Sequence, residues 1–307
     1  MTALEASARA LPARAEAAPP WKIWSALWVV YIVWGSTYLA IALMVETMPP
    51  LLAAGSRFTA VGLILLPILA WRRGAGVWRP SREELLAAGF VGLLLPGANA
   101  VISVAEQTVP SGLAALLIAS VPLWVILLRR LSGERISRRS LVAVLVGFAG
   151  VALLLKPEGE ATILGLLACI GGALMWATGS FASPRISLPR DPLVSTAWQS
   201  LLGGIVIVAV GFIAGEGGDV HPGEWSGRSI FGLIYLITFG SLLAFTSYAW
   251  LLQNAPISKV STYAYVNPVV AIALGWLILS ESITPMTLLG AGIIVASVAL
   301  VVRAESR

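Results

Sequence analysis

Long apolar runs alternate along the chain with short clusters of proline, glycine and charged residues, such as MPP, TVPSG, PEGE, LPRDP, NAP and SITP. Most runs approach the length of about 20 residues that a helix needs to cross the hydrocarbon of a bilayer. The pattern therefore predicts an all-α membrane protein with ten transmembrane helices. The predicted spans cover residues 21–45, 50–71, 85–107, 111–128, 140–155, 162–183, 192–214, 229–252, 257–279 and 285–302.

The two halves of the chain resemble each other. Three residues recur 142 positions later: Trp34, Pro50 and Gly62 as Trp176, Pro192 and Gly204. The segment AGVALLL at 149–155 recurs as ASVALVV at 296–302, which is 147 positions later. A slowly increasing offset indicates one repeat with small insertions.

Each half holds five predicted spans, and an odd number means that the two copies enter the membrane in opposite senses. The loop after the second span is basic (RRGAGVWRPSREE), whereas its counterpart is largely acidic (GEGGDVHPGEWSGR). We therefore expect a disordered cytoplasmic tail at 1–20 and two inverted five-helix repeats at 21–156 and 157–303. Inverted repeats are typical of alternating-access transporters, which bind substrate near the midplane.

Composition supports a membrane environment, since 58% of the 307 residues are hydrophobic and only 11% are charged. Soluble domains carry about 25% charged residues. With the N-terminus inside the cell, 17 of the 20 lysines and arginines fall in cytoplasmic segments, as the positive-inside rule requires. The basic excess is then a determinant of topology, and nucleic acid is not expected as a partner. We predict a multi-pass protein of the bacterial inner membrane with both termini cytoplasmic.

Residues that bind metals or cofactors are scarce. The single cysteine, Cys169, lies in an apolar run, and the single histidine, His221, lies in a polar loop. A zinc site needs three or four ligands. No metal, cofactor or catalytic residue is therefore expected.

Polar and aromatic side chains recur at helical spacing where leucine and valine would otherwise be expected. Asn99, Ser103 and Glu106, for example, share one face of the span 85–107. Two interpretations are open: these residues line a cavity, or they join helices through hydrogen bonds worth about 0.6 kcal/mol each. On the first interpretation the substrate-binding residues are Trp34, Tyr38, Asn99, Ser103, Ser120, Trp176, Ser180, Tyr263 and Asn267.

Two prolines, Pro122 and Pro268, lie 146 residues apart in the fourth span of each half. A proline inside a helix removes a backbone hydrogen bond and bends the helix. Such a break exposes polar backbone groups that lipid does not tolerate but a polar cavity can use. The matched pair is therefore predicted to form gating hinges beside the site, and the alternative is a kink that serves packing.

Formal charge within the spans is limited chiefly to Arg57 and Glu106, both predicted in the outer half of the membrane. A mutual ion pair is the least costly arrangement for two such residues. That pair is either structural, or it serves function, with Glu106 as a proton site and Arg57 as a contact for an anion.

Several strings together resemble the EamA-type branch of the drug/metabolite transporter superfamily. They are WGSTYLAI, PPLLAAGSRF, AEQTVPSGLAALLIASVPLW and YAYVNPVVAIALGWLILSE, and the resemblance covers residues 22–303. It implies a ten-helix inner-membrane carrier whose relatives export amino acids and related metabolites. The neutral, aromatic and amide-bearing candidates favour a neutral or aromatic amino acid as substrate of a monomer surrounded by lipid.

Other functional classes remain open at this point. A small-molecule channel should carry a charged ring or a carbonyl filter, and neither is evident in the sequence. A sensor is a further alternative. An intramembrane enzyme needs a nucleophile with its base, a carboxylate pair or metal ligands within the spans, and only one intramembrane acid is visible.

Overall fold

The computed structural model describes residues 19–155, 161–255, 257–260 and 262–305. Within these ranges the chain is helical and contains no strand. Eight segments are long and apolar enough to cross a membrane, and the helix Tyr263–Leu279 is a shorter apolar one. Nearly all of the expected tail at 1–20 lies outside the described residues.

The helices follow the predicted spans to within three residues at every end. They are α1 (Pro20–Met44), α2 (Pro50–Arg73), α3 (Arg82–Ala105), α4 (Ser111–Ile118), α5 (Val121–Leu131), α6 (Arg138–Leu154), α7 (Ile163–Ala182), α8 (Pro192–Ile213), α9 (Gly227–Tyr235), α10 (Ala244–Asn254), α11 (Ile257–Val260), α12 (Tyr263–Leu279) and α13 (Pro285–Glu305). A π-helical segment, η5 (Leu236–Leu243), joins α9 to α10. The span predicted at 111–128 is divided into α4 and α5.

Local sequence signals explain where several helices begin. Ser81 precedes α3 and forms a capping box with Glu84, in which each side chain binds the other residue's backbone N–H. Asp191 accepts hydrogen bonds from the first backbone amides of α8. Proline occupies the first turn of α1, α2 and α8, where the missing N–H costs no helical hydrogen bond.

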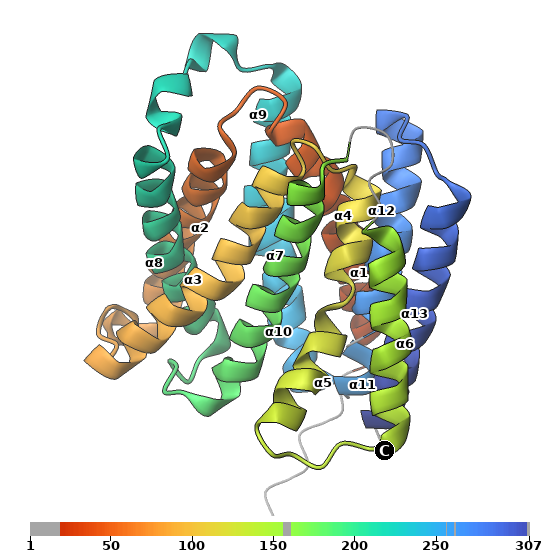
Figure 1. Cartoon of the computed structure of the whole chain (residues 1–307). Coiled ribbons are helices and arrows are strands. Elements are labelled where there is room, and N and C mark those ends of the chain that lie inside the picture. Colours follow the sequence, from red (N-terminus) through yellow and green to blue (C-terminus); the bar gives the residue numbers. More distant parts are fainter. Residues whose placement is uncertain (1–18, 156–160, 256, 261, 306–307) are drawn as a thin grey trace, which may run out of the picture.

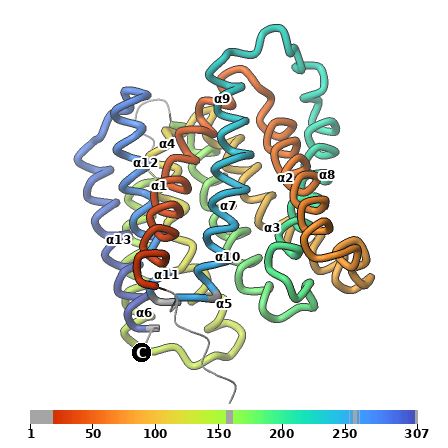
Figure 2. Tube along the Cα trace, turned by 180° about the vertical axis from the view of Figure 1, so that it is seen from behind, coloured from red at the N-terminus to blue at the C-terminus, as the bar shows by residue number. Residues whose placement is uncertain are grey.

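The helices pack as a bundle in which segments far apart in sequence lie side by side (Figures 1 and 2). Helix α2 packs against α8, α6 against α13, and α1 against α12, while α3 contacts both α7 and α8. Glycines allow the closest approaches, since a Cβ added to Gly203 would lie 2.4 Å from the carbonyl oxygen of Gly92. Small residues at helix crossings are a common device of membrane proteins.

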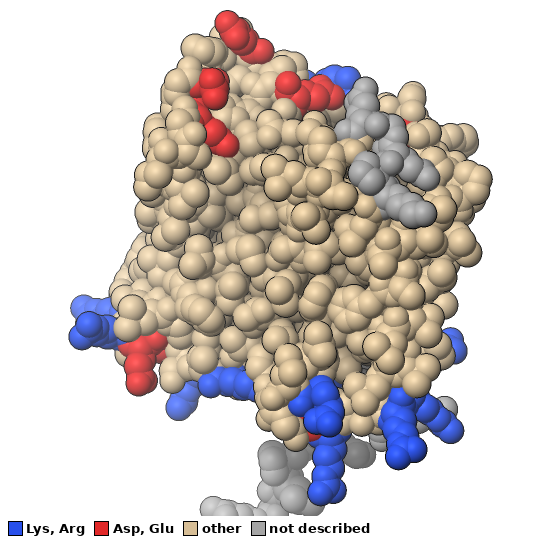
Figure 3. All heavy atoms as spheres, in the orientation of Figure 1, with Lys and Arg blue, Asp and Glu red and all other residues tan. Residues whose placement is uncertain are grey.

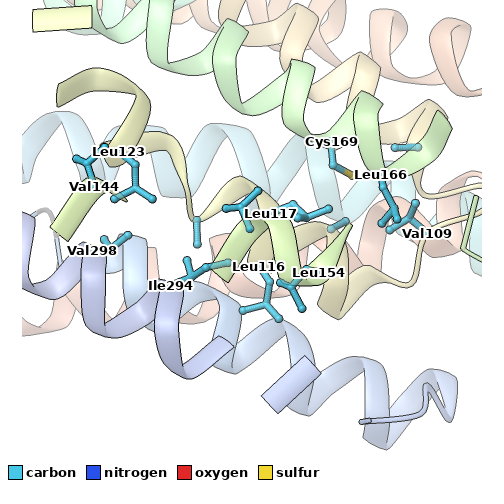
Figure 4. Close-up of a cluster of buried hydrophobic side chains, with 14 of the residues drawn as sticks. Val109, Leu116, Leu117, Leu123, Val144, Leu154, Leu166, Cys169, Ile294 and Val298 are labelled. Atoms are coloured by element: carbon cyan, nitrogen blue, oxygen red, sulfur yellow. The ribbon is translucent and has the colours of Figure 1, made fainter. Parts of the chain in front are cut away.

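A cluster of buried aliphatic side chains fills the space between α4, α5, α6, α7 and α13 (Figure 4). Leu117, Leu166 and Ile294 are fully buried there. Large apolar side chains also cover much of the outer surface, as at Leu145, which is 70% exposed. Such a surface suits lipid rather than water as the surrounding solvent.

On the face shown in Figure 3, charged side chains gather at the two ends of the bundle, and the surface between the ends shows none. One end, called here the basic end, carries the arginines of the α2–α3, α5–α6 and α7–α8 connections. Helix α1 begins and α13 ends there (Figures 1 and 2). The opposite, acidic end carries Glu46, Glu216, Asp219 and Glu224. At the basic end, hydrogen bonds from Arg129 and then Arg185 lower the pKa of Glu134.

Candidate functional site

A cavity of about 100 Å³ lies between α1, α2, α3, α4, α5, α7, α10 and α12 and is called here the central cavity. It is the meeting place of most of the predicted binding residues. Six of them line it: Trp34, Tyr38, Asn99, Trp176, Tyr263 and Asn267. Side chains from both halves of the chain therefore converge on one space.

Aromatic rings form one wall of the central cavity. The ring of Trp34 lies 5.2 Å from that of Tyr263 and 5.4 Å from that of Phe245, both in edge-on geometry. Tyr248 packs behind them, with its ring centroid 5.1 Å from that of Trp34. The indole nitrogen of Trp34 donates a hydrogen bond of 3.2 Å to the carbonyl of Gly240 in η5. The tryptophan is thus fixed in place by both rings and backbone.

The two asparagines place amide groups on the same cavity. Asn99 donates to the carbonyl of Leu95 at 3.2 Å and lies one helical turn from it. With its amide nitrogen as donor, Asn267 binds the carbonyls of Tyr31 and Tyr263, each at 3.2 Å. Asn267 therefore joins α12 to α1. It both lines the cavity and contacts a neighbouring helix, which are the two roles that the sequence left open.

The two prolines line the central cavity but do not break their helices in the same way. Helix α4 ends at Ile118, and Pro122 lies in the first turn of α5, directly after the break. Pro268 lies inside α12, and the interruption of that span falls earlier, between Val260 and Tyr263. Pro268 has no N–H to donate to the carbonyl of Ala264, which also lines the cavity.

Two predicted binding residues do not line either of the cavities described here. The hydroxyl of Ser103 donates to the carbonyl of Asn99 at 3.0 Å, and that of Ser120 donates to the carbonyl of Leu117 at 2.6 Å. Both side chains are buried. Their hydroxyls are satisfied within their own helices, as serine commonly is, and a role for them in binding stays a prediction.

A second cavity of about 290 Å³, called here the basic-side cavity, adjoins the first. The two share Trp34, Asn99, Trp176, Phe245 and Tyr263. Ser180, also predicted as a binding residue, lines the second cavity, which continues to Ser183 at the end of α7 and Pro192 at the start of α8. It therefore leads from the site toward the basic end.

Apolar side chains bound the central cavity on its acidic side. Ile41, Ile102 and Ile118 lie there, each closer to the acidic end than the aromatic wall. The described cavities thus connect the site with one end of the bundle and not with the other.

Arg57 and Glu106 do not form the predicted ion pair. Arg57 lines the central cavity, is only 3% exposed, and donates from Nε to the hydroxyl of Ser241 at 3.1 Å. No carboxylate lies within ion-pair distance of Arg57 among the residues that the structure describes. Glu106 is 7% exposed, and in the described part of the chain neither carboxylate oxygen has a hydrogen-bond partner.

Comparison with known proteins identifies the family of the chain. The EamA-like transporter family matches residues 21–156 and 163–303. The chain belongs to this family. It is 38% identical to the inner membrane transporter YedA of Escherichia coli (strain K12), covering 91% of this chain and 90% of that protein. It is 29% identical to the protein PecM of Dickeya dadantii, with 88% of both chains covered.

The solved structures agree on the fold. A crystal structure covering 91% of this EamA-like transporter and 95% of its own chain superposes with a TM-score of 0.61 at 20% identity. The family and the apolar helices together make the chain a multi-pass membrane transporter. The names of the relatives point to transport rather than catalysis.

Sequence reasoning missed the π-helical segment η5 of the EamA-like transporter. Its Gly240 and Ser241 bind Trp34 and Arg57, and Phe245 follows one turn later on the cavity wall. The adjacent glycine and serine are the only local signal, because such pairs accompany irregular helix geometry. A π-helical segment is often found at a functional site.

A carboxylate joins α12 to α4 at the acidic end. Glu281 follows α12 and accepts hydrogen bonds from the backbone amides of Ser111, at 2.7 Å, and Gly112, at 3.1 Å. These amides begin α4, whose N-cap residue Pro110 makes no side-chain cap. A Cβ added to Gly275 would lie 2.4 Å from Glu281 Oε2, so glycine is needed for the approach. This contact is called here the Glu281 clasp.

Proposed function

We propose that the EamA-like transporter is an inner-membrane secondary transporter that exports neutral or aromatic amino acids, or related small metabolites, by alternating access. The observation that carries the proposal is the aromatic, amide-bearing central cavity, which adjoins a passage to only one end of the bundle. Transport by alternating access requires such a site, reached from one side at a time. One chain contains the whole site, so a monomer suffices.

The chemistry of the cavity supports a small, partly apolar solute. Aromatic rings such as those of Trp34 and Tyr263 offer large apolar area together with polar edges. Asn99 and Asn267 add amide groups, and Pro268 leaves the carbonyl of Ala264 without its helical donor. An amino acid with an apolar side chain matches this mixture of surfaces.

The proposed orientation places the basic end in the cytoplasm. Cytoplasmic loops of membrane proteins are enriched in lysine and arginine, and Figure 3 has most of these side chains at one end. Since the basic-side cavity leads to that end, the described conformation faces inward. The acidic end and the Glu281 clasp then lie at the closed outer side.

The proposal includes ten membrane spans arranged as two inverted repeats. Reciprocal contacts across the helix pair α2–α8 support it. A Cβ added to Gly62 would lie 2.6 Å from Leu201 Cβ, and one added to Gly204 would lie 2.4 Å from the backbone nitrogen of Thr59. Each residue of the first contact has its counterpart 142 positions away in the second, as expected for an approximate twofold axis between the repeats.

The pair α6–α13 repeats this relation with the offset of 147. A Cβ added to Gly147 would lie 3.1 Å from Ser297 Cβ, and one added to Gly150 would lie 3.1 Å from Ile294 Cγ1. The same axis therefore accounts for both pairs. Two copies related in this way can exchange their conformations, which closes one side as the other opens.

Glu106 is the proposed coupling residue. A buried carboxyl group without a partner in the described part of the chain is costly to keep charged. Ionisable residues inside membrane proteins commonly mark proton pathways. Glu106 lies in the outer half, beyond Ile102, where binding and release of a proton would accompany opening to the outside.

The test is uptake by purified protein in liposomes, using a panel of radiolabelled amino acids with and without an imposed pH gradient. We expect saturable uptake of at least one neutral or aromatic amino acid, and faster uptake with a gradient in the wild type than in Glu106→Gln. A gradient response that persists in Glu106→Gln removes its coupling role. Unitary currents in planar bilayers, without saturable uptake, would identify a channel instead.

A further inference from the structure

The central cavity has one buried charged side chain among its described lining residues. Arg57 extends from the first half of α2, is 3% exposed, and lines the cavity between α1 and η5. Burying a guanidinium is costly unless a countercharge or several hydrogen bonds compensate it. A positive charge in this position within a membrane protein is a functional feature by default.

The described contacts of Arg57 fix its position without neutralising its charge. Nε donates to the hydroxyl of Ser241, which is itself fully buried. The guanidinium carbon lies 4.7 Å from the ring centroid of Phe58, close enough for a cation–π contact. Gly240 adjoins Nη2, and a Cβ added there would lie 3.5 Å from that atom. Glycine thus leaves room beside the end of the guanidinium.

No acidic side chain lines either cavity among the residues that the structure describes. Arg57 is also the one charged side chain in the described lining, so that lining carries a net positive charge. This differs from the neutral cavity that the sequence suggested. The missing partner of a fixed guanidinium is an anion, and a carboxylate matches the guanidinium fork with two parallel hydrogen bonds.

We propose that Arg57 binds the carboxylate of the transported solute, and that the substrate class is aromatic or apolar monocarboxylates, with or without an amino group. This inference rests on the proposed transport function and narrows its substrate. The carboxylate binds at Arg57, while the apolar body contacts Trp34, Tyr38 and Tyr263. An ammonium group finds no carboxylate among the described lining residues, so it is not required.

A competing interpretation makes Arg57 a purely structural residue that ties α2 to η5 through Ser241. The two interpretations differ in ligand selectivity. A structural residue would not favour a carboxylate over its uncharged amide. A binding residue must favour it, because hydrogen bonds that involve charged groups contribute about 1.5–3 kcal/mol each, or roughly tenfold to a hundredfold in affinity.

The experiment measures binding of four probes with the same phenyl body to the purified full-length protein by calorimetry. The probes are 3-phenylpropanoate, L-phenylalanine, 3-phenylpropanamide and 2-phenylethylamine. We expect both carboxylates to bind at least tenfold more tightly than the amide and the amine. In Arg57→Gln the preference of 3-phenylpropanoate over 3-phenylpropanamide should fall below threefold, with amide binding unchanged.

Arg185→Gln is the matched control, because Arg185 also lies over a phenylalanine ring but stands at the basic end, outside both cavities. Arg185→Gln should keep the full preference for 3-phenylpropanoate over 3-phenylpropanamide. Arg57→Lys should keep part of this preference, since lysine retains the positive charge but lacks the paired N–H donors of the guanidinium. Equal binding of propanoate and propanamide in the wild type overturns the inference, even if every Arg57 variant fails to fold.

The inference is also overturned if Arg57→Gln weakens binding of 3-phenylpropanoate and 3-phenylpropanamide by the same factor, so that the preference is kept. It is overturned as well if neither carboxylate binds to the wild type. The transport function is decided separately by the uptake panel. Saturable uptake in the panel together with equal binding of 3-phenylpropanoate and 3-phenylpropanamide would leave the transport function in place and remove the carboxylate site. Absence of uptake for every solute of the panel would contradict the transport function itself.

Discussion

At the scale of single residues, two tryptophans dominate the proposed binding site. Trp34 is fixed by its hydrogen bond to Gly240 and by three neighbouring rings. Trp176 lines both cavities from α7, in the other half of the chain. Large aromatic surface of this kind is a major source of affinity for apolar solutes.

The first prediction concerns these tryptophans. Trp176→Ala and Trp34→Ala should each weaken binding of 3-phenylpropanoate by about 1–3 kcal/mol, because stacking and buried apolar area are lost. Trp34→Ala should also lower thermal stability, since three ring contacts disappear. Calorimetry and thermal melting measure the two effects, with the exposed Trp78→Ala as control. Unchanged affinity in both cavity variants would make these tryptophans packing residues.

Most of the predicted binding residues line the central cavity, because helical spacing and the similarity of the two halves of the chain single out Trp34, Asn99, Trp176 and Asn267. The sequence could not separate a hydroxyl that faces a cavity from one that is hydrogen-bonded within its own helix, as those of Ser103 and Ser120 are. It also paired Arg57 with Glu106. Whether those two side chains meet depends on the rotation and tilt of α2 and α3. Tertiary packing sets both, and the spacing of residues along the sequence does not.

At the scale of elements, the interrupted helices are the parts that can move. The sequence marked both interrupted spans through Pro122 and Pro268, but it could not locate the second break, which precedes Pro268. The π-helical geometry of η5 was equally hidden, since its sequence is an ordinary apolar run. Helix bounds were predictable because prolines and polar caps delimit them.

The second prediction concerns the prolines. Pro268→Ala restores a donor for the Ala264 carbonyl and straightens α12, whereas Pro122→Ala favours joining α4 to α5. Because the two spans belong to the two halves of the chain, which we propose are inverted repeats, the variants should shift the equilibrium between the inward- and outward-facing states in opposite directions. The measurement is maleimide labelling of Ile41→Cys from outside and Ser180→Cys from inside, without Cys169. A shift of about 1.4 kcal/mol changes the ratio of inward- to outward-facing protein tenfold. Unaltered labelling with normal transport would mean that the two prolines only kink their helices.

The third prediction concerns the Glu281 clasp. Glu281→Gln keeps the shape of the side chain but removes the charge that favours the N-terminus of α4. Outside labelling of Ile41→Cys should therefore rise several-fold. Glu216→Gln is the matched control, because Glu216 caps Leu51 and Leu52 of α2 in the same manner but away from the central cavity. An equal rise in both variants would show a general loosening of the outer side.

At the scale of the whole molecule, the distribution of charged side chains and the symmetry of the proposed repeats determine how the transporter is oriented in the membrane. The all-helical fold was predictable because the membrane allows few alternatives for apolar runs of this length. The direction in which the cavity opens was not predictable, since both facing states use the same helices and differ only in their packing.

The fourth prediction concerns topology. With the basic end in the cytoplasm, Gly218→Cys in the α8–α9 connection should react with an impermeant maleimide in intact cells. Ser132→Cys, in the α5–α6 connection, should react only after permeabilisation. Both positions are exposed, and a side chain at 218 meets open space. The reversed labelling pattern would invert the orientation and turn the described conformation into an outward-facing one.

The most direct test of alternating access around one central site is substrate counterflow in liposomes. Liposomes containing the purified protein are loaded with unlabelled substrate identified by the uptake panel, and then diluted into a trace of the same labelled substrate. We expect a transient accumulation of label above equilibrium, which Trp176→Ala reduces and Trp78→Ala does not. Label that only approaches equilibrium, at a rate independent of internal substrate, would contradict a carrier with a single alternately exposed site.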